Sequence, residues 1–96
     1  MYLVHVALRR PRRTTELPAE IRELVLSRAL ARERIEHISV HPRASPHPVL
    51  GVYLLAERLE EAEGHAERAC RRALEDCPQL ARWELVDAQV PLLDVP

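Results

Sequence analysis

The segment from Ile35 to Cys77 limits the fold more than any other part of the chain. Residues 35–41 alternate in polarity, as a strand with one buried face does. Prolines interrupt residues 42–48, and residues 49–55 are then almost continuously apolar, which is typical of a central strand. Apolar residues return at helical spacing over 60–77. This segment is therefore predicted to form a strand, a tight reversal, a strand and a helix.

The residues before this segment predict one more strand and one more helix. Residues 2–8 alternate in polarity, and the arginine-rich stretch 9–13 with Pro11 ends the strand. A helix is predicted to open at residues 14–18, where Pro18 suits the first turn, and to run to about Arg34. Leu26 and Leu30 lie off its apolar stripe, so they either pack under a neighbouring loop or form part of a patch that binds a partner.

The residues after the segment predict a last strand over 83–90. Its alternation sends Val86, Ala88 and Val90 inward and sends Trp83, Leu85, Asp87 and Gln89 outward. The apolar tail 92–96 is expected to dock on the domain.

The predicted order is β-α-β-β-α-β, which resembles the ferredoxin-like plan. That resemblance implies an α+β fold in which a four-stranded antiparallel sheet, in the order 4-1-3-2, carries both helices on one face. The chain of 96 residues is long enough for one such domain, residues 1–96, with a core of its own.

Composition excludes several functional classes. A formal net charge of −1 argues against a nucleic-acid binder, and no apolar run approaches the roughly 20 residues of a membrane span. Cys70 and Cys77 lie seven residues apart on one helix, too far for a disulfide, so we expect free buried thiols in a reducing compartment, the cytoplasm. All 14 basic residues are arginine, which suggests a GC-rich, actinobacterial genome.

A ferredoxin-like sheet with an apolar open face is similar to the dimeric α+β-barrel group, in which two sheets stack face to face. The apolar third strand, the tail and the outward Trp83 and Leu85 carry this resemblance. It implies a homodimer and extends to antibiotic-biosynthesis monooxygenases and related cyclases, which need no metal. No residue motif of that enzyme group is present, so its chemistry is not assigned. Small actinobacterial proteins of unknown function share the same plan.

Histidines supply the remaining chemical signal. His5 and Asp87 are expected on adjacent strands of the open face, where they could act as a general base and the residue that orients it. Ligand contacts are expected from six other residues of that face, namely His37, His41, Tyr53, Trp83, Leu85 and Gln89. His41 and His47 flank the proline-rich loop, but two histidines do not complete a metal site, so no metal or cofactor is predicted.

Three functions stay open at this point. The first is a small non-catalytic homodimer that binds a partner protein or a small apolar ligand through its open sheet face. The second is a cofactor-independent barrel enzyme that uses His5 and Asp87. A third is an anion-binding module that uses the loop arginines Arg9, Arg10, Arg12 and Arg13.

Overall fold

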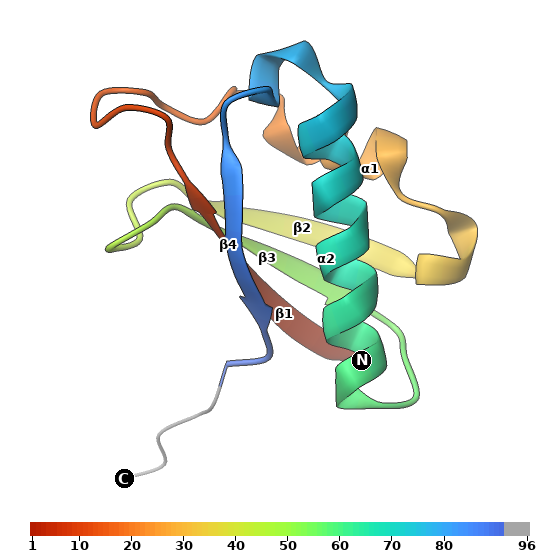
Figure 1. The fold of residues 1–96 in the computed structure, drawn as a ribbon. Coiled ribbons are helices and arrows are strands. Elements are labelled where there is room, and N and C mark those ends of the chain that lie inside the picture. The colour runs from red at the N-terminus through yellow and green to blue at the C-terminus, as the bar shows by residue number, and fades with distance from the viewer. Residues whose placement is uncertain (92–96) are drawn as a thin grey trace, which may run out of the picture.

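The computed structural model describes residues 1–91 and contains four strands and two α-helices (Figure 1). The strands are β1 (Tyr2–Arg9), β2 (Ile35–His41), β3 (Val49–Leu54) and β4 (Glu84–Gln89). The helices are α1 (Ile21–Arg28) and α2 (Leu59–Asp76), and two short 3₁₀ turns, η1 (Ala31–Glu33) and η2 (Pro78–Leu80), follow them. The predicted docking of the tail 92–96 lies outside the described residues.

All three strand pairs are antiparallel, and the sheet order is β2-β3-β1-β4. Read from the other edge, this is the order 4-1-3-2 that the sequence predicted. The α+β, ferredoxin-like fold is therefore confirmed. Neither described helix is both long and apolar enough to cross a lipid bilayer.

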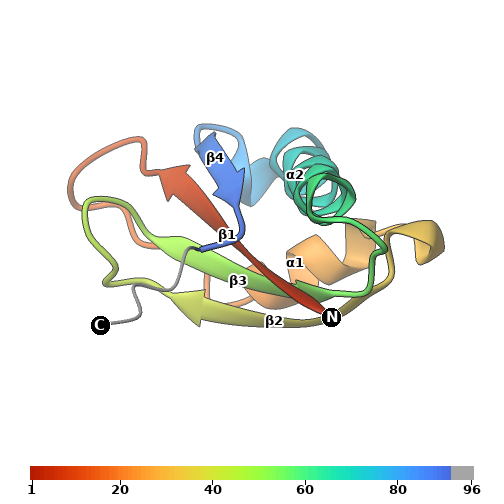
Figure 2. The ribbon, with the colours of Figure 1, turned by 90° about the horizontal axis from the view of Figure 1, so that it is seen from below.

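Both helices lie against the same face of the sheet, and the other face carries no helix (Figures 1 and 2). The covered face contributes alternate residues of each strand to one apolar core. Its fully buried strand residues are Val4, Val6, Leu8, Ile38, Leu50, Val52 and Leu54. The helix α2 meets them mainly through small residues, namely Ala62, Ala66, Ala69, Cys70 and Ala73. Small side chains let the helix lie close to the sheet, so little room is left for larger ones.

The cysteines of α2 and its C-terminal end belong to this core. Cys70 and Cys77 are free and buried. Burial, together with the nearby Glu33 carboxylate, raises the pKa of the Cys70 thiol to about 12. The Cys70 thiol is therefore uncharged at neutral pH and behaves as a small apolar group.

The first helix is much shorter than predicted. It begins at Ile21 and ends at Arg28 because the extended backbone of Ala29 breaks it, and η1 follows separately. Arg34 then adopts a left-handed conformation, with φ of 54°, and directs the chain into β2. The expectation of one helix over 14–34 is wrong at both ends.

Two leucines of this region stay at the surface. Leu26 is 39% exposed and Leu30 is 38% exposed. Within residues 1–91 no loop buries them, so the first of the two alternatives, packing under a neighbouring loop, is wrong. Leu59, the first residue of α2, is also exposed.

A β-bulge in β4 reverses part of the predicted alternation. Ala7 pairs with Asp87, but the next residue of β1, Leu8, pairs with Leu85, which leaves Val86 as an extra residue. Leu85 therefore shares the inner face with Leu8 and packs against the core, and Trp83 is only 5% exposed within the core. The predicted outward positions of Trp83 and Leu85 are wrong, because simple alternation does not survive a bulge.

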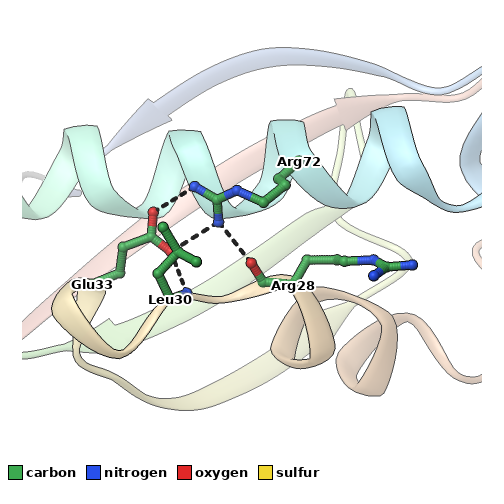
Figure 3. Close-up of polar contacts among 4 residues, drawn as sticks. All are labelled: Arg28, Leu30, Glu33 and Arg72. Carbon is green, nitrogen blue, oxygen red and sulfur yellow. Dashed lines mark hydrogen bonds and ion pairs between the residues drawn. The ribbon is translucent and has the colours of Figure 1, made fainter.

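An ion pair joins η1 to the middle of α2 (Figure 3). The guanidinium of Arg72 donates to both carboxylate oxygens of Glu33, at 3.0 and 2.9 Å, and also to the Arg28 carbonyl at 2.7 Å. Glu33 accepts a further bond from the Leu30 backbone N–H at 2.8 Å, and its side chain is only 1% exposed. The Glu33–Arg72 pair thus holds the end of α1, η1 and α2 together.

The protonation state of Glu33 follows from these contacts. Burial alone would raise the pKa of its carboxyl, but the hydrogen bonds from Arg72 and Leu30 outweigh burial and lower it. Because the folded-state pKa lies below the unfolded value, the pair stabilises the fold above the unfolded pKa and loses this effect as the pH falls through the folded pKa.

We predict that Arg72→Met lowers the free energy of unfolding at pH 7 by about 3 kcal/mol, because it leaves a buried carboxylate without its cation. At acidic pH the difference in the free energy of unfolding between Arg72→Met and wild type should become smaller, because Glu33 takes up a proton. Urea unfolding at pH 7 and pH 4 measures both effects. Arg71→Met is the matched control, since Arg71 pairs with Glu67 at the surface and should cost less than about 0.5 kcal/mol. Equal losses for the two variants would contradict this account.

Candidate functional site

The open face of the sheet presents its side chains in three rows that run across the strands. The first row is His37, Tyr53 and Leu3, the second is Ser39, Gly51, His5 and Gln89, and the third is His41, Val49, Ala7 and Asp87. No helix covers these residues (Figure 2). This face therefore brings several polar and aromatic side chains together on one surface.

Gly51 occupies the middle of this face, between Ser39 of β2 and His5 of β1. A Cβ at this position would collide with the Ser39 hydroxyl and come within 3.2 Å of Leu3 Cδ1. Glycine is thus required here by the close approach of a neighbouring side chain rather than by its backbone angles. Its missing side chain lets the serine hydroxyl lie over the centre of the sheet.

The space above Gly51 brings three polar groups together. Ser39 Oγ and His41 Nε2 are hydrogen-bonded at 3.0 Å. The rings of His41 and His5 lie 6.4 Å apart between centroids and are tilted by 53°. Two imidazoles and one hydroxyl from two non-adjacent strands therefore meet over one glycine.

A second aromatic contact lies in the neighbouring row. The His37 and Tyr53 rings are 5.4 Å apart between centroids. The two ring planes are tilted by 42°, and both rings carry polar atoms. Four of the predicted contact residues, His37, His41, Tyr53 and Gln89, thus lie on the open face with the predicted general base His5, whereas the roles of all five stay predictions.

A groove runs from these histidines toward the β2–β3 loop. It has a volume of about 570 Å³, which is within the usual range for small-molecule sites. The residues that line it are His5, Val40, His41, Pro42, Arg43, Ala44 and Val49. The walls are mainly aliphatic, while the imidazoles and the Arg43 guanidinium can donate hydrogen bonds at the edge.

The predicted general base and its orienting residue are on the same face but are not joined. His5 lies opposite Gln89, and Asp87 lies opposite Ala7, one step further along β4. Among residues 1–91 no hydrogen bond links His5 to Asp87, and the ring that His5 approaches belongs to His41. His41 therefore has the His5 ring of β1 as its aromatic neighbour.

Trp83 and Leu85 cannot contribute to the open face, because both contact the helical layer. Together with Arg71, Leu74 and Glu75 of α2, they line a separate depression on the covered side. The open face therefore has less apolar area than predicted.

A further cavity of about 600 Å³ lies beyond the C-terminal end of β1. It brings the loop residues Arg9, Arg10 and Arg12 together with Arg82, whereas Arg13 does not line it. The sequence did not predict Arg82 as a member of this arginine group. The antiparallel pairing of β1 with β4 places Arg82 there, because the start of β4 lies beside the end of β1.

Neither the described residues nor the comparisons with known proteins point to a metal site or to a family. Within residues 1–91, no three His, Cys, Asp or Glu side chains are grouped closely enough to hold a metal ion. Comparison with protein-family models, with curated proteins and with solved structures finds no match for this chain. The function must therefore be argued from the geometry of the chain itself.

The contact between Gly51 and Ser39 gives a direct test of the open-face geometry. We predict that Gly51→Ala lowers stability by about 1 kcal/mol, because the new methyl group displaces the Ser39 hydroxyl. In a Ser39→Ala background, Gly51→Ala should leave the free energy of unfolding almost unchanged. A double-mutant cycle of urea unfolding measures this difference as the coupling energy between the two positions.

Gly64→Ala in α2 is the matched control for this cycle. Its Cβ would meet only the end of the flexible Arg68 side chain, so it should stabilise the helix by about 0.5 to 1 kcal/mol in both backgrounds. A Gly51→Ala effect that is the same with and without Ser39 would contradict the predicted contact.

Proposed function

We propose that the protein is a non-catalytic binding protein that holds a small, largely apolar ligand on the open face of its sheet. The observation that carries this proposal is the groove of about 570 Å³ beside His5 and His41. Aliphatic walls favour an apolar body, and the imidazoles and Arg43 favour one acceptor group at its end. Buried, free cysteines support a reducing compartment such as the cytoplasm.

We further propose that a second copy of the chain covers this face. The fold leaves it without a helix, while Leu3, Ala7, Val49 and Tyr53 on the two central strands are each only half-buried. Stacking two such faces would enclose these residues and turn the open groove into a closed one. The site would then lie between the two subunits.

A cofactor-independent enzyme has less support. General-base catalysis by His5 needs a partner that fixes the ring, and Asp87 is not bonded to it. Ser39 is hydrogen-bonded to one nitrogen of His41, but no described group bonds to the other nitrogen. The arrangement binds hydrogen-bonding ligands without supplying a complete catalytic set.

We predict that wild type binds the neutral apolar probe N-phenyl-1-naphthylamine saturably, with enhanced probe fluorescence. Ala44→Phe should weaken this binding by at least about tenfold, because the ring fills the groove without introducing a charge. Ala31→Phe is the matched control, since Ala31 is exposed on η1, away from the groove, and should change the affinity less than about twofold.

Circular dichroism confirms that both variants are folded before the titration. Absence of saturable binding in wild type would overturn the proposed ligand class. Equal weakening by the two phenylalanines would show that the probe binds elsewhere.

A further inference from the structure

The arginine-lined cavity at the end of β1 is independent of the open-face groove. It lies where two segments meet: the end of β1 with the loop after it, and the turn that leads into the start of β4. Its lining consists of Arg9, Arg10, Pro11, Arg12, Thr15, Arg82 and Glu84. The register of β1 with β4, in which Arg9 lies opposite Glu84, brings Arg82 close to the loop arginines.

The positive charges in this cavity are largely uncompensated. Among residues 1–91, only Arg9 of the four arginines has a carboxylate within 4.0 Å, and this pair with Glu84 is long, at 3.9 Å, and exposed. Exposed pairs of this kind contribute little. Four guanidinium groups thus face a cavity that contains one carboxylate, so the lining carries a net positive charge.

One of the four guanidinium groups is held in place without being neutralised. Arg10 Nη1 donates to the Thr15 carbonyl at 3.0 Å and to the Arg13 carbonyl at 3.5 Å. Carbonyl acceptors orient the side chain, while its full charge remains available to an anion. A fixed donor loses less side-chain entropy on binding than a free one does.

We infer that this cavity binds a small molecule that carries a phosphate or diphosphate group. Guanidinium groups match phosphate oxygens with paired hydrogen bonds, and an anion with several charges relieves the repulsion among neighbouring arginines. A volume of about 600 Å³ exceeds what one phosphate needs, so it leaves room for an organic group.

The charge distribution argues against a nucleic acid as the occupant. The whole chain has a net charge of −1, and the arginines of this cavity form one compact group rather than an extended basic face. A duplex or a long single strand would need such a face to bind tightly at physiological salt. A small phosphorylated molecule needs only the cavity itself.

Isothermal titration of the full chain with pyrophosphate, beside inorganic phosphate, tests this inference. We expect pyrophosphate to bind more tightly than phosphate and more weakly as sodium chloride rises from 50 to 200 mM. Arg82→Gln and Arg12→Gln should each weaken pyrophosphate binding by at least about tenfold, the loss expected for one charge-assisted hydrogen bond.

Arg13→Gln is the matched control, because it removes one charge from the same loop without altering the lining of the cavity. It should change the affinity less than about threefold, and circular dichroism should show all three variants folded. Equal losses for Arg13→Gln and Arg82→Gln would overturn the inference in favour of general charge attraction. Failure of wild type to bind pyrophosphate at 50 mM salt would overturn it, and so would tighter binding of a single-stranded oligonucleotide.

Discussion

Two helices cover one face of a four-stranded sheet and leave the other face open, and the rest of this structure depends on that constraint. The covered face requires alternate apolar residues on every strand and small residues on α2, which lies close to the sheet. The Glu33–Arg72 pair then holds the short first helix and its 3₁₀ turn against α2. The open face is free of these packing demands, so it is where histidines, a serine and a strand glycine gather.

The bulge at Val86 connects the packing of the core to the character of the open face. Without it, Leu85 and Trp83 would add apolar area to the open face, as the resemblance to stacked barrels assumed. With it, both side chains belong to the core, and Gln89 and Asp87 remain outside. A surface of mixed polarity with a local apolar groove is suited to holding a ligand with a polar end. That is the physical basis for preferring a binding function over a purely structural contact between sheets.

Much of the fold could be predicted from periodicity, because strands 2–9 and 35–41 and the long helix show their patterns clearly. The outward position of His5, His37 and His41 followed from the same alternation and is confirmed by the register with β3. The short α1 could not be predicted, since its end depends on an extended Ala29 that no local residue signals. The bulge in β4 could not be predicted either. The sequence shows which residues alternate in polarity, but not which residue of β1 each residue of β4 pairs with. Gly51 was the available clue to the centre of the site, as an interior strand glycine indicates a close approach by a neighbour.

Sedimentation equilibrium on wild type beside Ala7→Glu tests the central claim, that the open face is a binding surface closed by a second copy. Ala7 lies on this face between Val49 and Asp87. A substitution of Leu85 would not test the face, because Leu85 packs against the core. We expect wild type to have a mass of about twice the 11.0 kDa of one chain, and the folded Ala7→Glu variant to have the mass of a single chain. A wild type that stays at 11.0 kDa at every concentration, or a variant that remains a dimer, would contradict it.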